Sequence, residues 1–285
     1  MTDSFSVLEL FKKSSDFLSK KGIKSHKADA EWIFQEILQI KKIDIFLDQL
    51  IINVKEDLNK LREALIRRSK REPLQHIIGH VEFINCTIKA DHRALIPRFE
   101  TESLVEFLAE RLPKDFDKEI YDFGTGSGAI IVALAKKYPS SRCIGFDKSK
   151  DALSLAMENV QINNCSQNTK IEHFDWTKET VSKKCNVLIS NPPYLSLKEW
   201  KQCETEVKEY DPKCALISDN EGKKDIDVIM SKIPETLERG GLMALEFGKG
   251  QCEYIVNRYE KMFLNLEIKK DLNGVRRFLV GEFGT

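Results

Sequence analysis

The stretch Asn191-Pro192-Pro193-Tyr194 follows the apolar run NVLIS and combines an amide, a rigid backbone and a phenol ring. Proline has no backbone N–H, so the Pro192 carbonyl and the Asn191 amide oxygen are two hydrogen-bond acceptors beside one ring. Two acceptors next to a ring suit a planar NH₂ group, such as a carboxamide or an aromatic amine. We expect all four residues to bind that group, and Asn191, Pro192 and Tyr194 to orient its nitrogen for attack on an electrophile.

A glycine-rich loop precedes this stretch, in the sequence YDFGTGSGAI. Gly124, Gly126 and Gly128 fit the pattern G-x-G-x-x-G/A between a strand and a helix, where glycines let the backbone turn and approach a ligand. The intervening Thr125 and Ser127 belong to the same expected binding loop. The pattern alone also describes a structural turn without a ligand.

An acidic residue, Asp147, ends the next expected strand, 19 residues after Gly128. A carboxylate there can accept hydrogen bonds from ribose hydroxyls, which indicates an adenosine-containing cofactor. These residues do not separate NAD from S-adenosylmethionine. Asp122 favours the second, because D-x-G-x-G-x-G resembles the first motif of Rossmann-fold methyltransferases. Asp122 would face the methionyl ammonium or order the loop.

A third strand end carries Asp175 and Trp176, in the sequence HFDW. Ligands of doubly wound sheets bind at the carboxyl ends of strands. Asp175 could accept from an adenine amino group and Trp176 could cover the ring, although a core tryptophan is the simpler interpretation. The four features therefore predict one site, which also includes Asn191 on the cofactor side.

The elements that would position these residues alternate from Glu119 onward, with short apolar strands followed by helices. This order predicts an α/β, Rossmann-like sheet over residues 96–285. Residues 73–95 resemble a linking β-hairpin, and residues 1–72 show helical periodicity of apolar residues, which predicts a small bundle. The polar segment from Lys198 to about Asn220 is expected to be an irregular lid.

The bundle carries 15 Lys and Arg against 12 Asp and Glu, and six of the basic residues cluster near its end: Lys60, Arg62, Arg67, Arg68, Lys70 and Arg71. A solvated helix face is the simpler interpretation, and a docking surface is the functional one. The whole chain has 45 basic and 45 acidic residues, so we do not expect a protein that binds nucleic acid through a general excess of positive charge.

The seven cysteines are odd in number and widely spaced, which disfavours disulfides and zinc sites. We expect no metal, because a sulfonium methyl donor supplies its own leaving group. We also expect a cytoplasmic monomer with no membrane association, because no long apolar run or signal-like N-terminus is present.

The combined motifs resemble the PrmC/HemK family of release-factor glutamine methyltransferases. The similarity extends from residue 71 to the C-terminus, through REPLQHIIGHVEF, LIPRFETE, FDW, SNPPY and EYDPKCAL. That family also carries a helical domain before this region. Phe99 replaces a frequent Pro, which could change a wall of the substrate pocket, and Phe123 replaces a usual Leu in the core.

The resemblance implies a class I S-adenosylmethionine-dependent methyltransferase fold, with S-adenosylhomocysteine as the product. It implies that the substrate is the glutamine of the Gly-Gly-Gln motif in class-1 peptide chain release factors, methylated at N5, without any need for nucleic acid. Arg98 and Glu100 are weaker candidates near the substrate, and the helical bundle would dock the release factor. The alternative is a DNA or RNA amino methyltransferase acting on adenine N6 or guanine N2.

Overall fold

A computed structural model describes residues 5–47, 51–52 and 55–284 of the chain. The chain divides into two compact units, residues 1–79 and 80–285. The boundary lies inside the stretch that the sequence analysis assigned to a linker, so that stretch contributes a short helix to the first unit and a hairpin to the second.

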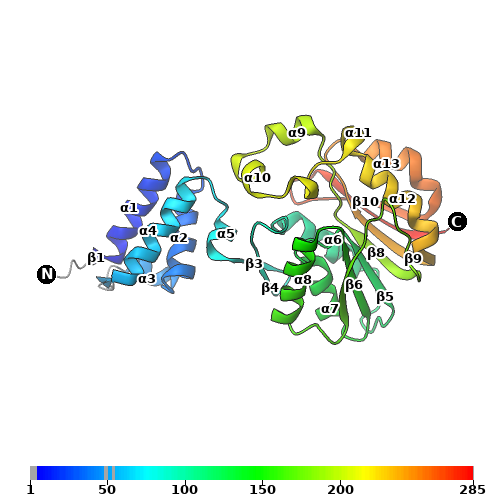
Figure 1. Cartoon of the computed structure of the whole chain (residues 1–285), viewed down its shortest axis with the longest axis horizontal. Helices are drawn as coiled ribbons and strands as arrows, with labels where there is room; N and C mark the ends of the chain where they lie inside the picture. Colours follow the sequence, from blue (N-terminus) through cyan, green and yellow to red (C-terminus); the bar gives the residue numbers. More distant parts are fainter. Residues whose placement is uncertain (1–4, 48–50, 53–54, 285) are drawn as a thin grey trace. The chain divides into compact units, whose positions relative to one another are not determined.

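The first unit is a small helical bundle (Figure 1). Ser6 caps the first helix, and Gly22 follows its end with a left-handed φ of 78°, as a C-terminal glycine does. A single core cluster of aliphatic and phenylalanine side chains joins the helices. The helices are α1 (Val7–Lys20), α2 (His26–Ile37), α3 (Lys42–Phe46), α4 (Lys55–Ser69) and α5 (Leu74–Ile78), with the two-residue strands β1 (Phe5–Ser6) and β2 (Ile51–Ile52).

The basic cluster at the end of α4 is not a uniformly solvated face, so the simpler interpretation is wrong for part of it. Arg68 is only 6% exposed, and its Nε donates to Asp29 of α2 at 2.6 Å. Arg67 donates to both carboxylate oxygens of Glu72. These two guanidinium groups therefore form hydrogen-bonded ion pairs with carboxylates of their own unit.

The second unit contains a seven-stranded sheet in the order β10-β11-β9-β8-β5-β6-β7. Strands β9, β8, β5, β6 and β7 run parallel, whereas β11 is antiparallel to both of its neighbours, β9 and β10. The expected α/β sheet is thus present. Its strands are β5 (Glu119–Phe123), β6 (Arg142–Asp147), β7 (Thr169–His173), β8 (Cys185–Ser190), β9 (Leu237–Glu246), β10 (Phe263–Lys270) and β11 (Arg276–Phe283).

Helices cover both faces of this sheet, as Figure 1 shows. Because side chains alternate along a strand, neighbouring residues such as Ile120 and Tyr121, or Ile189 and Leu188, enter different core clusters. One cluster includes α6 (Phe99–Ala109) and α7 (Ala129–Lys137), and α8 (Lys150–Ile162) contacts the same strands. The other includes α12 (Lys224–Thr236) and α13 (Cys252–Tyr259), which precedes the 3₁₀ turn η2 (Glu260–Met262).

The strand order reverses at β5, which pairs with β6 on one side and β8 on the other. In open α/β sheets a ligand crevice forms outside the carboxyl ends of the strands at such a point. The glycine loop follows β5, Asp147 ends β6 and Asn191 follows β8. The topology therefore brings three of the predicted features to one edge.

A hairpin of β3 (His80–Phe83) and β4 (Cys86–Lys89) packs its buried side chains into the same core as α6 and α7. The segment expected to be an irregular lid instead contains short helices, and a capping box of Ser196 and Glu199 begins the first of them. These elements are α9 (Leu197–Gln202), α10 (Thr205–Tyr210), η1 (Lys213–Ala215) and α11 (Asp219–Gly222). In the described part of the chain, no helix has the length and apolarity needed to cross a membrane.

The buried pair of Arg68 and Asp29 gives a first prediction. Both side chains are 8% exposed, so Arg68→Met would leave the Asp29 carboxylate buried without its partner. We expect a loss of about 3–5 kcal/mol from the first unit, because an uncompensated buried charge is costly. Hydrogen exchange of the α2 and α4 amides measures this loss.

The matched control is Lys60→Met, which removes an exposed ion pair with Glu56 on the same helix. Protection of these amides should not change in that variant, because exposed pairs contribute little. The double variant Asp29→Leu/Arg68→Met should recover most of the lost protection. Unchanged exchange in Arg68→Met would show that the pair does not stabilise the bundle.

Candidate active site

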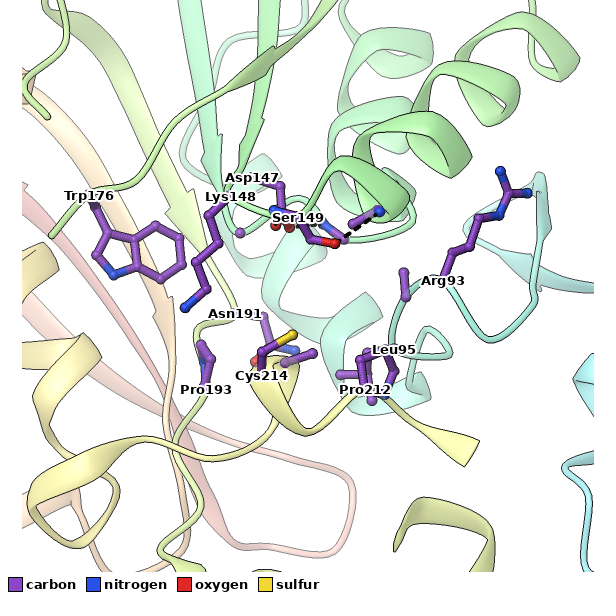
Figure 2. Close-up of a pocket in the computed structure, with 15 residues that line it drawn as sticks. Arg93, Leu95, Asp147, Lys148, Ser149, Trp176, Asn191, Pro193, Pro212 and Cys214 are labelled. Carbon is purple, nitrogen blue, oxygen red and sulfur yellow. Dashed lines mark hydrogen bonds between the residues drawn. The ribbon is translucent and has the colours of Figure 1, made fainter. Parts of the chain in front are cut away.

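Three adjoining cavities lie at the carboxyl edge of the sheet, and Asn191 lines all of them. We call the first the loop cavity, and Figure 2 shows its walls. The second is the tyrosine cavity. The third lies along the glycine loop and is lined by Pro97, Arg98, Thr101, Thr125 and Ser127, among others.

The predicted residues divide among these cavities. The loop cavity is lined by Gly124, Gly126, Asp147, Trp176, Asn191 and Pro193, together with Arg93, Ser149, Cys214 and others. The tyrosine cavity is lined by Arg98, Asn191, Pro192 and Tyr194, together with Cys203 and Val207. Four predicted residues line none of the three cavities: Asp122, Gly128, Asp175 and the weaker candidate Glu100.

The glycine loop has little room for side chains. Gly124, Gly126 and Gly128 have φ values of 76°, 56° and 83°, in the left-handed region that favours glycine. A Cβ on Gly124 would lie 3.2 Å from the Trp176 ring, and one on Gly128 would lie 3.1 Å from the Ala156 Cβ. The loop therefore needs glycine both for its left-handed backbone and for its close packing on Trp176 and Ala156.

Asp122 is fully buried beneath this loop, and its Oδ2 accepts a hydrogen bond from the Thr125 hydroxyl at 2.7 Å. Burial raises the pKa of Asp122 to about 7, against the lowering effect of that hydrogen bond. Its Oδ1 has no partner among the described residues. The contact orders the loop, and the unpartnered oxygen is chemically suited to a cationic group of a ligand.

Asp147 reaches the loop cavity with both carboxylate oxygens partly engaged. Oδ2 accepts from the Gly126 N–H at 3.0 Å, and Oδ1 accepts from the Ser149 N–H at 2.9 Å. Burial is the main cause of its raised pKa. Each carboxylate oxygen has a second lone pair, so Asp147 can hold the loop and still accept from a ligand hydroxyl.

Trp176 and Asp175 are placed differently, although they are adjacent. Trp176 lines the loop cavity, stacks on Phe123 at an interplanar angle of 13°, and donates from Nε1 to Asp225 at 3.0 Å. Asp175 instead accepts from both the hydroxyl and the N–H of Thr177. The bond from the hydroxyl is the main cause that lowers the pKa of Asp175 to about 2. Phe123 is thus a core residue directly behind Trp176.

The Asn-Pro-Pro-Tyr stretch is held at both ends. The Asn191 Nδ2 donates to the Thr101 hydroxyl at 3.1 Å, and the Tyr194 hydroxyl donates to Glu246 at 3.0 Å. The Tyr194 carbonyl accepts from the Gln251 Nε2 at 3.0 Å. Burial is the main cause of the raised pKa of Tyr194, so its phenol is neutral.

Sequence reasoning missed four of the side chains that hold this site: Thr101, Asp225, Glu246 and Gln251. For Glu246 a signal existed, because it ends a strand of the same parallel sheet, as Asp147 does. Gly222 also belongs to this set, since a Cβ there would collide with the Tyr194 carbonyl.

The segment around Arg98 contributes unequally to the site. The Arg98 guanidinium lines the tyrosine cavity and donates to the buried Asp211 at 2.5 Å. Glu100 is half-buried on α6. Phe99 is 71% exposed and lines none of the three cavities, so it forms no part of their walls.

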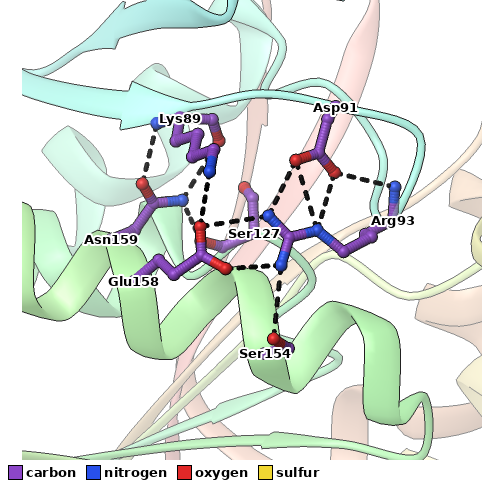
Figure 3. Close-up of polar contacts among 7 residues, drawn as sticks. All are labelled: Lys89, Asp91, Arg93, Ser127, Ser154, Glu158 and Asn159. Carbon is purple, nitrogen blue, oxygen red and sulfur yellow. Dashed lines mark hydrogen bonds and ion pairs between the residues drawn. The ribbon is translucent and has the colours of Figure 1, made fainter.

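A cluster behind the glycine loop joins β4 to α8 (Figure 3). The Asn159 side chain is fully buried, donates to the carbonyls of Ser127 and Lys89, and accepts from the Lys89 N–H. Arg93 donates to Asp91 and Glu158, which raises the pKa of the guanidinium.

Among the described residues no group of three His, Cys, Asp or Glu could hold a metal ion.

Comparisons with known proteins agree with this architecture. Residues 9–79 match the family described as PrmC N-terminal domain, and residues 100–207 match Methyltransferase small domain. The hMettl16 catalytic domain, crystallised with an RNA hairpin, has a TM-score of 0.55 at 13% identity over 88% of this chain and 90% of that one. A methyltransferase from Pyrococcus furiosus has a TM-score of 0.50 at 15% identity, over 70% and 90%. These likenesses confirm the methyltransferase fold.

Curated relatives extend over nearly the whole chain. The release factor glutamine methyltransferase of Fusobacterium nucleatum is 34% identical over 277 residues, 96% of this chain and 78% of that protein. The enzyme of the same name from Buchnera aphidicola is 35% identical over 275 residues, 92% and 97% of the two chains. The resemblance inferred from the motifs is therefore confirmed: the chain belongs to the release factor glutamine methyltransferase family.

Proposed function

We propose that this protein transfers a methyl group from S-adenosylmethionine to N5 of the glutamine in the Gly-Gly-Gln motif of class-1 release factors. The family relationship supports the substrate, since the relatives are named release factor glutamine methyltransferases. The observation that carries the chemistry is the orientation of Asn191. Its NH₂ donates to Thr101, which leaves its oxygen to accept from a substrate amide.

The residues around the loop cavity fit S-adenosylmethionine. Gly124, Gly126 and Asp147 suit the ribose and the neighbouring atoms, and Trp176 suits the adenine. Asp122 lines none of the cavities, so its role would be to order the glycine loop through Thr125. When bound, S-adenosylmethionine would supply an electrophilic methyl group on a sulfonium and would be left as the neutral thioether S-adenosylhomocysteine, while the methylated amide would lose one N–H proton to solvent. We assign no metal to the reaction.

The substrate amide would occupy the tyrosine cavity beside Asn191. The Asn191 oxygen and the Pro192 carbonyl would accept the two hydrogens of the glutamine NH₂, and the Tyr194 ring would pack against its plane. These contacts fix the direction of the nitrogen lone pair, which is poorly nucleophilic because of amide resonance. Catalysis would then depend on orientation, since no His lines any of the three cavities.

We propose that the helical first unit docks the release factor, with Arg98 near the incoming glutamine and the protein acting as a cytoplasmic monomer. The alternative, a nucleic-acid amino methyltransferase, gains no support from the curated relatives. The chain has no excess positive charge for phosphate binding either.

Replacing Asn191 tests this function. We expect Asn191→Ala to lower kcat by about 100-fold or more, because the amide loses an acceptor that orients it. Mass spectrometry of the Gly-Gly-Gln peptide, after reaction of the full-length enzyme with release factor, measures the transfer. Asn257→Ala, an exposed asparagine on α13, is the matched control.

The same reaction mixture should be offered duplex DNA and ribosomal RNA in parallel, with a radiolabelled methyl donor. Label on the glutamine alone supports the proposed function. Label confined to nucleic acid would refute it, and full activity of Asn191→Ala would refute the role given to the amide.

Asp147→Asn tests the cofactor assignment. The change keeps one acceptor oxygen but removes the charge, so we expect roughly 10- to 100-fold weaker S-adenosylmethionine binding, because hydrogen bonds to a charged group contribute about 1.5–3 kcal/mol. Titration calorimetry measures the affinity, and Asp151→Asn on the exposed face of α8 is the control. Equal affinities of Asp147→Asn and the parent would rule out a ribose contact by this carboxylate.

A further inference from the structure

Four side chains from distant parts of the chain form a continuous hydrogen-bonded series behind the substrate cavity. The Asn191 Nδ2 donates to the Thr101 hydroxyl at 3.1 Å, and this hydroxyl donates to Glu246 Oε2 at 2.8 Å. The Tyr194 hydroxyl donates to the other oxygen, Glu246 Oε1, at 3.0 Å. Glu246 therefore connects the first and last residues of the Asn-Pro-Pro-Tyr stretch.

The series is shielded from solvent at its centre. Thr101 is 4% exposed and Glu246 is 2% exposed. Thr101 lies in the first turn of α6, and Glu246 is the last residue of β9. Burying a carboxylate is costly unless its oxygens receive hydrogen bonds. Glu246 is buried and each of its oxygens accepts from a hydroxyl, so its presence here calls for a functional explanation.

The direction of donation in this series determines which end of the Asn191 amide faces the cavity. An ionised Glu246 only accepts, so the Thr101 hydrogen points to Glu246 and a Thr101 lone pair points to Asn191. Only the NH₂ end of Asn191 can satisfy that lone pair. The amide oxygen is then left toward the substrate.

The opposite orientation would not support the reaction. If the Thr101 hydrogen pointed to Asn191, the amide oxygen would turn to accept it and the NH₂ would face the cavity. Two NH₂ groups, that of Asn191 and that of the substrate glutamine, would then meet without an acceptor between them. The choice of orientation therefore decides whether a glutamine amide can bind productively.

We infer that Thr101 and Glu246 are positioning residues that hold the Asn191 amide with its oxygen toward the substrate, and that Glu246 also fixes the Tyr194 ring. This inference rests on the proposed function, because it concerns the site of that same reaction. Neither residue needs to touch the substrate, so both act through Asn191 and Tyr194.

The charges around Glu246 determine when this arrangement holds. Burial, with a smaller contribution from Glu100 on α6, raises the pKa of Glu246 to about 7. The hydroxyls of Thr101 and Tyr194, and Arg277 on β11, lower it. Because the ionised form is the one that accepts from both hydroxyls, the productive fraction should increase as the pH rises through about 7.

Thr101→Val removes the hydroxyl while keeping the shape of the side chain. We expect kcat for release-factor methylation to fall about 10- to 100-fold, as for other residues that orient a reacting group. The KM for release factor and the calorimetric affinity for S-adenosylmethionine should stay close to those of the parent. Thr101→Ser, which restores the hydroxyl, should recover most of the lost kcat.

Thr236→Val is the matched control, because Thr236 is also buried and precedes the opposite end of β9. A parent enzyme that methylates no release factor would refute the proposed function. A parent enzyme that does so, with Thr101→Val equally active or with Thr101→Ser as impaired as Thr101→Val, would refute the positioning role alone.

Glu246→Gln supplies a second measurement that does not depend on Thr101. A glutamine cannot accept from both hydroxyls through its two terminal atoms, so kcat should be low at every pH. The parent kcat should fall as the pH is lowered from about 8 to about 6, because Glu246 becomes protonated. Parent-like kcat and an unchanged pH profile in Glu246→Gln would overturn the inference.

Discussion

The pairing of β5 with both β6 and β8 is the constraint on which the rest of this structure depends. The parallel register sets Phe123 beside Phe146 and beside Ser190, so the residues that follow these strands begin at the same height. The glycine loop, the Asp147 carboxylate and the Asn191 amide therefore lie close together in space, although they are far apart in the sequence. A slip of one residue in either pairing would turn the strand side chains to the opposite face and displace the site.

Buried carboxylates are the second theme of this edge. Asp122, Asp225 and Glu246 are each less than 9% exposed, and each accepts from at least one hydroxyl group. Hydroxyl donors compensate part of the cost of burial without adding a positive charge. The edge thus gains fixed acceptors and negative character.

The sequence predicted the sheet, and it singled out residues that line the loop and tyrosine cavities, because glycine loops and strand ends have local signatures. It could not predict Thr101 as the partner of Asn191, because their contact spans 90 residues and depends on how α6 packs. It placed Asp175 at the cofactor, where the structure shows a side chain that caps its own turn. A short polar side chain can form a hydrogen bond with the neighbouring backbone instead of with a ligand. A sequence motif does not distinguish these two roles. The segment 198–220 was expected to be irregular because its helices are too short for a clear period, although the capping box of Ser196 and Glu199 at the first of them is recognisable.

The bonds of Asn159 to Lys89 and Ser127 have a consequence for the order of folding. They join the end of the hairpin, the glycine loop and α8, so docking of the hairpin fixes the Asn159 side chain that holds the loop. The loop therefore loses much of its conformational entropy when the chain folds, so a ligand that binds later does not have to order it. The hairpin is consequently a support for the glycine loop rather than a spacer, and a fragment that begins after residue 89 would retain every predicted cofactor ligand yet lose the Lys89 bonds that hold the Asn159 side chain against the loop.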